Sequence, residues 1–129
     1  MNIVTRYGIG LALMTALSGC ASPPLAVKTH AENFRDGEQA YSEKKYEDAI
    51  AHWKKVKESY QSPELTTMAE LNIANALYNI GNYIEAAAEY ESFRKLHPKH
   101  EKAPYALFRL GMCHFQQISG IDTDQTPVN

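Results

Sequence analysis

The sequence predicts an all-α protein made of helical hairpins that repeat along the chain. Three observations carry this prediction: a helical period, a turn signal within it, and the recurrence of both. In the stretch 71–90, apolar residues recur at three- and four-residue spacings on both sides of Gly81-Asn82, as expected of amphipathic helices. Gly81 can adopt the left-handed backbone conformation that ends a helix, and Pro98 stops the second helix.

The same pattern recurs at a step of 37 positions, which is the separation between Gly37 and Ala74. At this step the matching pairs are Tyr41 with Tyr78, Tyr46 with Tyr83, Ala49 with Ala86, and Trp53 with Tyr90. One step further along the chain, the residues that match Ile73, Ala74 and Tyr78 are Leu110, Gly111 and Phe115. The order of small residue, turn, aromatic residue, alanine, aromatic residue and proline resembles the tetratricopeptide repeat (TPR), a helical hairpin that stacks into solenoids. We therefore predict tetratricopeptide-type helical-hairpin repeats forming a short right-handed solenoid of about two and a half repeats.

The predicted elements follow one another along residues 31–117. We expect repeats at 31–61 and 62–98, an incomplete repeat at 99–117, and a loop or tail at 118–129. The expected helices cover 31–43, 46–60, 63–80, 83–96 and 103–117. Ser62 before Pro63 has the order of an N-cap and a first helical residue. Lys44-Lys45 replaces the turn glycine in the first hairpin, so we expect that hairpin to be less ideal than the second.

Several residues within the repeats have expected roles in packing. Gly37 lies where two helices must approach closely, and Trp53 is expected in the core, with a ligand role as the alternative. Cys113 is expected to be a buried, unreactive thiol. His97 and His100 lie in a polar turn without cysteines or carboxylates at ligand spacing, so we expect both to be solvated rather than to bind a metal.

The N-terminus differs in character from the repeats. Arg6 precedes a short apolar run at 9–17, which is typical of a secretory signal and short for a membrane-spanning helix. Leu17-Ser18-Gly19-Cys20 resembles a bacterial lipobox, so we predict a lipoprotein signal peptide at 1–19, a lipidated Cys20 and a flexible tether at 20–30. Ala21 stands where inner-membrane lipoproteins commonly have aspartate, so the resemblance favours the outer membrane. The alternative is a secreted protein with an incidental cysteine.

Composition and motifs exclude several function classes. Fifteen acidic residues against 13 basic ones leave no basic surface for nucleic acid. The sequence has no glycine-rich phosphate loop, no zinc spacing of its two cysteines, and no motif around a serine or histidine that would mark a nucleophile. Asp122 and Asp124 lack the glycine and distal glutamate of a calcium loop. We predict a protein without enzymatic activity, metal or cofactor, apart from the covalent lipid on Cys20.

The first helices of stacked hairpins line a concave surface, which predicts a peptide-binding groove. Three rows of residues recur on this face at the 37-residue step, with Asn79 beside them. The predicted groove residues are Phe34, Leu71 and Phe108; Glu38, Asn75 and Met112; and Tyr41, Tyr78 and Phe115. The alternative is that the aromatic rows are core between repeats and that more polar neighbours form the groove.

The lipobox, the tether and repeats of this length together resemble the BamD family, the outer-membrane lipoproteins of the β-barrel assembly machinery, also described as ComL-type lipoproteins. The stretches that carry the resemblance after Cys20 are Tyr46-Glu47-Asp48-Ala49-Ile50, Gly81-Asn82-Tyr83, Leu96-His97-Pro98, Tyr105-Ala106-Leu107-Phe108-Arg109-Leu110-Gly111 and Gly120-Ile121-Asp122-Thr123-Asp124-Gln125-Thr126. Thr123 departs from the arginine that the family often has between the two aspartates.

The resemblance implies a lipid-anchored protein of the outer membrane that faces the periplasm. Its implied partners are unfolded outer-membrane β-barrel proteins, bound by the N-terminal repeats, and other assembly subunits including BamA. The repeats that dock on BamA are missing from this sequence, and the unpaired helix at 103–117 leads us to expect a truncated chain. The alternative function is a TPR scaffold lipoprotein of another envelope system, in pilus or secretin assembly or as a peptidoglycan-associated adaptor.

Overall fold

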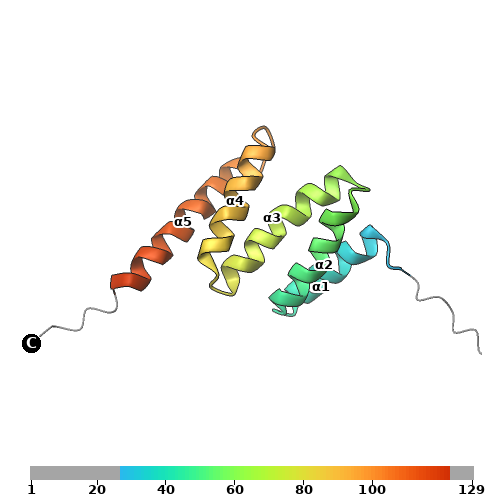
Figure 1. Ribbon diagram of the computed structural model, residues 1–129, viewed down its shortest axis with the longest axis horizontal. Coiled ribbons are helices and arrows are strands. Elements are labelled where there is room, and N and C mark those ends of the chain that lie inside the picture. The colour runs from blue at the N-terminus through green and yellow to red at the C-terminus, as the bar shows by residue number, and fades with distance from the viewer. Residues whose placement is uncertain (1–26, 123–129) are drawn as a thin grey trace, which may run out of the picture.

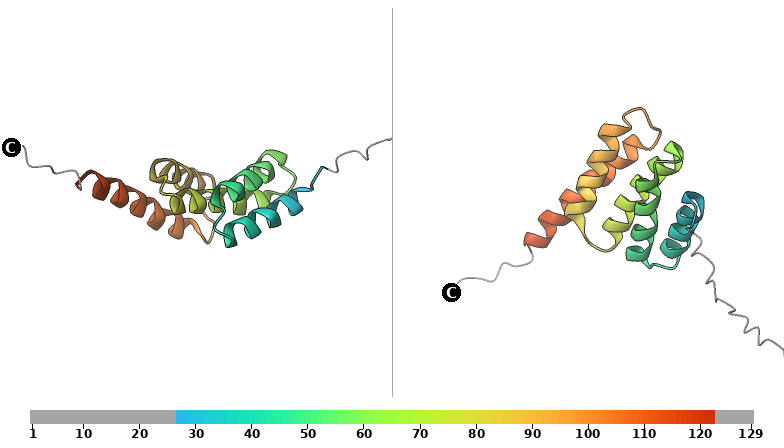
Figure 2. Two further views of the ribbon diagram at one scale, coloured as in Figure 1. Left: turned by 90° about the horizontal axis from the view of Figure 1, so that it is seen from below. Right: turned by 45° about the vertical axis from the view of Figure 1, so that its right-hand side comes forward.

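The computed structural model describes residues 27–122, and these residues form a row of consecutive helices (Figure 1). The helices are α1 (His30–Ser42), α2 (Tyr46–Ser59), α3 (Pro63–Asn79), α4 (Tyr83–Leu96) and α5 (Ala103–Asp122). Each helix packs against the next along the chain, and α1 also contacts α3. Figure 2 shows that the helices follow one another in an elongated row. The predicted all-α fold of sequential hairpins is confirmed.

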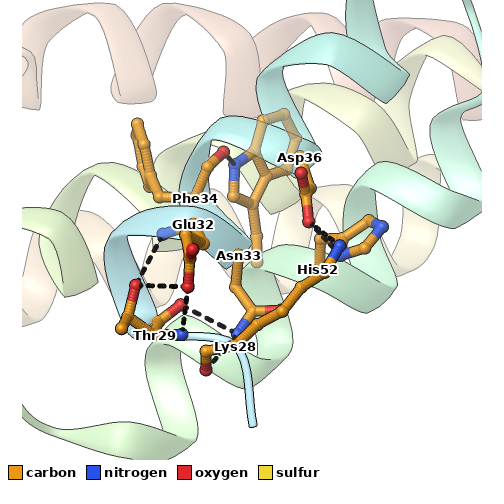
Figure 3. Close-up of polar contacts among 8 residues, drawn as sticks. Lys28, Thr29, Glu32, Asn33, Phe34, Asp36 and His52 are labelled. Carbon is orange, nitrogen blue, oxygen red and sulfur yellow. Dashed lines mark hydrogen bonds and ion pairs between the residues drawn. The ribbon is translucent and has the colours of Figure 1, made fainter. Parts of the chain in front are cut away.

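Local sequence signals set the starts of the helices. Thr29 caps α1 in a capping box: its hydroxyl accepts from the Glu32 amide, and the Glu32 carboxylate accepts from the Thr29 amide at 2.8 Å (Figure 3). Ser62 caps α3 in the predicted way, accepting from the Leu65 amide with Pro63 at the first helical position. These caps satisfy backbone amides that the helices themselves leave without partners.

The two predicted turns have the same geometry. Gly81 adopts φ 82°, and Lys44 adopts φ 61° at the equivalent place in the first hairpin. The Lys44 and Gly81 amides donate to the carbonyls of Tyr41 and Tyr78 at 3.0 and 3.1 Å respectively. The first hairpin therefore forms the same turn without glycine, with a lysine in a conformation that is sterically unfavourable for residues carrying a Cβ.

The core runs along the row between the helices. Trp53 is 2% exposed and lies over Gly37, where an added Cβ would come within 2.5 Å of the indole nitrogen. The Trp53 Nε1–H donates to the Phe34 carbonyl oxygen at 3.3 Å. The expected core role of Trp53 and the close packing at Gly37 are thus confirmed. Cys113 is buried as predicted, and burial raises the pKa of its thiol.

Two expectations about local structure were wrong. Helix α5 continues to Asp122, whereas we expected a loop from residue 118 onward. Gly120 costs a helix only about 1 kcal/mol relative to alanine, so the turn-like composition of 118–122 does not end the helix. His97 is not simply solvated: its Nε2 lies 2.6 Å from Oε2 of the buried Glu70, and its ring packs on Phe93.

Other predictions fall on residues that the structure does not describe. These are the signal peptide at 1–19, the lipidated Cys20, most of the tether at 20–30, and the tail from 123 onward. Within 27–122, no helix combines the length and apolar character needed to cross a bilayer. The same described residues contain no group of three or more histidine, cysteine, aspartate or glutamate side chains positioned to hold a metal ion.

Candidate functional site

The predicted groove residues come from α1, α3 and α5, and they differ widely in exposure. Phe108 and Phe115 of α5 are 63% and 61% exposed, whereas Phe34 and Leu71 are only 5% and 8% exposed. Glu38 and Asn79 are exposed, and the half-buried members are Tyr41, Asn75, Tyr78 and Met112. Phe34 and Leu71 thus offer a ligand little side-chain surface. Most of the accessible apolar surface in the predicted rows lies on α5.

A hydrogen bond joins the first two repeats across this face. The Asn79 Nδ2 of α3 donates to the Tyr41 hydroxyl oxygen of α1 at 2.7 Å. Burial raises the pKa of Tyr41, and the hydrogen bond from Asn79 opposes that effect without cancelling it. The phenol is therefore neutral at physiological pH, and its proton remains available as a donor.

A second and larger group of side chains joins α3, α4 and α5. We call it the tyrosine–arginine cluster and define it as Asn75, Tyr78, Tyr90, Tyr105 and Arg109. The Arg109 guanidinium carbon lies 3.7 Å from the centroid of the Tyr78 ring, a cation–π contact. Its Nε donates to the Tyr90 hydroxyl at 3.1 Å. The Asn75 Oδ1 accepts from the Tyr90 and Tyr105 hydroxyls at 2.6 and 2.9 Å.

The direction of these hydrogen bonds follows from the arginine. A guanidinium can only donate, so the Tyr90 oxygen accepts from Arg109 and its own proton can go to Asn75. Burial raises the pKa of Tyr90 well above its usual value, against the lowering effect of Arg109, so the phenol stays neutral. The cluster consequently carries the positive charge of Arg109 and no negative charge of its own.

Sequence reasoning selected Asn75 and Tyr78 but missed Tyr90, Tyr105 and Arg109 as members of a polar site. Tyr105 lies three positions before the selected Phe108 on α5 and Arg109 directly after it, and Tyr105 and Arg109, four positions apart, occupy one face of the helix. That spacing could have identified both. Tyr90 matches the core residue Trp53 at the 37-residue step, and its ring is buried in the same way, while its hydroxyl reaches the cluster.

A pocket of about 480 Å³ lies beside the predicted groove. Its walls are the start of α3, Phe93 of α4, and the connection before α5; the lining residues are Pro63, Glu64, Thr67, Met68, Leu71, Asn72, Phe93, His100, Glu101 and Lys102. Leu71 lines the pocket and belongs to the predicted groove rows. A volume of this size can hold one large side chain of a bound peptide.

The fold and the site together define a class of protein: an all-helical TPR-like repeat protein with a mixed aromatic and polar face. Comparison with known proteins narrows the class. The family profile described as "YfiO: Outer membrane lipoprotein" matches residues 27–129. The chain therefore belongs to the YfiO/BamD family of outer-membrane lipoproteins, as the lipobox and repeat motifs predicted.

Two relatives agree with this assignment, and a third agrees with the TPR-like repeat fold. The chain is 28% identical to the outer membrane protein assembly factor BamD of Rickettsia prowazekii over 129 residues, covering 98% of this chain and 51% of that protein. It is 26% identical to BamD of Caulobacter vibrioides over 80 residues, covering 62% of this chain and 26% of that protein. It is also 31% identical to human tetratricopeptide repeat protein 4 over 96 residues, covering 74% of this chain and 23% of that protein.

The chain thus spans about half the length of the Rickettsia relative and about a quarter of the Caulobacter relative. No solved structure matches the chain significantly.

Proposed function

We propose that this chain is a non-catalytic binding module of the machinery that assembles outer-membrane β-barrel proteins. In this proposal it is anchored by a lipid on Cys20, faces the periplasm, and binds unfolded barrel segments along α1, α3 and α5. The observation that carries the proposal is the family membership over residues 27–129, joined to relatives named as outer membrane protein assembly factors.

The surface chemistry supports an extended, partly apolar ligand. Phe108 and Phe115 present exposed aromatic surface, and an apolar contact area of this kind is what a barrel strand's outward-facing side chains would bury. Glu38 of α1 and Asn79 of α3 are exposed and can hydrogen-bond to the amides of an extended peptide. The groove proposal includes the predicted residues Tyr41, Asn75, Tyr78 and Met112, with Phe34 and Leu71 acting as support from beneath.

Partner subunits are a separate part of the proposal. We expect BamA and other assembly subunits to contact the longer members of the family chiefly through the part that this chain does not match. The repeats described here would then serve substrate recognition more than subunit docking.

Photo-crosslinking tests substrate recognition directly. A benzoylphenylalanine at Phe108 would be offered a C-terminal peptide of an outer-membrane barrel, a scrambled version with the same terminus, and the periplasmic domains of BamA. The matched control places the crosslinker at Ile84, which is 73% exposed on α4. We expect capture of the barrel peptide at Phe108 and not at Ile84.

Equal capture of the barrel and scrambled peptides at Phe108 would contradict sequence recognition. Absence of capture, together with co-sedimentation of the protein with peptidoglycan, would instead favour the alternative of an envelope scaffold.

A further inference from the structure

The Arg109 guanidinium has donors that the structure leaves unused. Arginine carries five N–H donors, and one of them, on Nε, is bonded to Tyr90. Among the side chains of residues 27–120, no acidic group lies within salt-bridge distance of Arg109, and no hydrogen bond joins the terminal nitrogens of Arg109 to these residues. A half-buried cation stacked on an aromatic ring is therefore without a counter-ion in the described fold.

The Asn75 side chain also has unused donors beside this charge. Its Oδ1 accepts from two tyrosine hydroxyls, which orients the amide and directs its Nδ2 away from them. Within the described residues Nδ2 has no hydrogen-bond acceptor. The guanidinium and the Asn75 side chain are both bonded to the Tyr90 hydroxyl, which holds the two side chains in one cluster.

We propose that the tyrosine–arginine cluster is a carboxylate-binding site, in which Arg109 and the Asn75 amide donate to the two oxygens of a carboxylate. A planar carboxylate matches the fork of a guanidinium, and charge-assisted bonds of this kind are roughly twice as strong as neutral ones. The Tyr78 and Tyr105 rings beside the guanidinium suit an organic acid with an apolar portion. The single positive charge of the cluster matches a carboxylate monoanion, whereas it would neutralise only half of the charge of a phosphate dianion.

This inference deepens the proposed peptide groove and rests on it for the ligand's biological source. The carboxylate could be the C-terminus of a bound chain or an aspartate or glutamate side chain within it. Tyr105, four positions before Arg109, lies on the same face of α5 and is 39% exposed, with its ring centroid 6.0 Å from the guanidinium carbon. A ligand with an apolar part next to its carboxylate would therefore contact charge and aromatic surface together.

Small probes test the site without relying on any barrel substrate. The probes are N-acetylphenylalanine, its amide, the amidated dipeptide N-acetyl-Glu-Phe-amide, and inorganic phosphate. The whole chain, labelled with ¹⁵N, is titrated with each probe while the Arg109 Nε–Hε and Asn75 Nδ2–H₂ resonances are followed. We expect N-acetylphenylalanine to shift both resonances. Its amide lacks the carboxylate and should bind at least about tenfold more weakly. A response to the glutamate dipeptide would identify a side-chain carboxylate as an acceptable ligand.

The variant Asn75→Asp separates binding from folding. Aspartate has the same shape, can accept both tyrosine hydroxyls, and places an internal carboxylate beside Arg109, so the fold should be kept while the site is occupied from within. We expect an unchanged or higher Tm and loss of the response to N-acetylphenylalanine. The control Asn72→Asp adds the same charge on the same helix outside the cluster and should retain the response.

Identical responses to N-acetylphenylalanine and its amide would overturn the proposal, as would full binding by Asn75→Asp or a response to phosphate alone. These outcomes are distinct from failure of the proposed function. The crosslinking experiment compares two peptides that share a free C-terminus, so it tests sequence recognition, whereas the amide comparison tests recognition of the carboxylate.

Discussion

In the first hairpin the Tyr41 and Tyr46 rings meet edge to face with centroids 5.2 Å apart, and in the second Tyr78 and Tyr83 do so at 5.1 Å. The turns between them use the same backbone hydrogen bonds, although one contains Lys44 and the other Gly81. The α1–α2 and α3–α4 hairpins therefore share one backbone plan.

They differ at the aromatic position of their second helices. Trp53 in α2 packs against Gly37 and turns its only polar group inward, to the Phe34 carbonyl. Tyr90 in α4 is equally buried, but its hydroxyl reaches Asn75 and Arg109. The buried phenol of Tyr90 thus packs as the indole of Trp53 does, and its hydroxyl also organises a polar site.

The comparison predicts the largest loss of stability at Trp53. Trp53→Ala would remove a fully buried ring and leave a cavity between α1 and α2, which costs about 3–5 kcal/mol. Urea denaturation followed by circular dichroism measures the free energy of unfolding. Trp53→Phe, which keeps a ring at the site, should cost clearly less. Equal losses for the two variants would contradict the packing role.

A smaller loss is expected at Gly37, the partner of that ring. In Gly37→Ala the new Cβ would lie 2.5 Å from the Trp53 indole nitrogen, and overpacking of this kind costs about 1–3 kcal/mol. Gly111→Ala is the matched control, because a Cβ there meets no atom within 4 Å. Urea denaturation should show the control to be neutral or slightly stabilised through its higher helix propensity.

The hydroxyl of Tyr90 should contribute less to the free energy of unfolding than the packing of Trp53 against Gly37. Tyr90→Phe keeps the ring but removes the group that links Asn75 to Arg109, which costs about 1–2 kcal/mol. The Arg109 Nε–Hε resonance should shift at the same time. Unchanged stability with an unchanged Arg109 signal would mean that the two hairpins do not differ in the way described.

The smallest effects are expected from exchanging the turn residues. Lys44→Gly removes the backbone strain of a lysine at φ 61° and should stabilise the chain by less than about 1 kcal/mol. Gly81→Lys introduces such strain and should destabilise the chain by a similar amount. Thermal unfolding of the two single variants and the double exchange checks this. Effects of the same sign for both variants would contradict the equivalence of the turns.

Much of the fold could be predicted from local signals. Ser62-Pro63 and Gly81 fixed element boundaries because capping and a left-handed backbone depend on the residue itself. The errors arose where composition was a poor guide. Residues 118–122 look like a loop but continue α5, and His97 is held by the buried Glu70, which lies 27 positions earlier.

The candidate site was predicted only in part. The 37-residue step placed Asn75 and Tyr78 on a shared face, but periodicity does not report which side chains touch. Arg109 received no role because its position on α5 gains meaning only from Tyr78 and Tyr90 on two other helices. Contacts between helices of different repeats depend on the distances and angles at which those helices pack.

By itself, the sequence determined the all-α repeat architecture, the turns and the family, since these rest on residue spacing, backbone preference and motifs. Tertiary structure alone decided that Phe34 and Leu71 are buried while Phe108 and Phe115 are exposed, although all four share one predicted face. The reason is that exposure depends on which neighbour covers each helix. The same packing brings Asn75, Tyr90 and Arg109 from three helices into one hydrogen-bonded cluster.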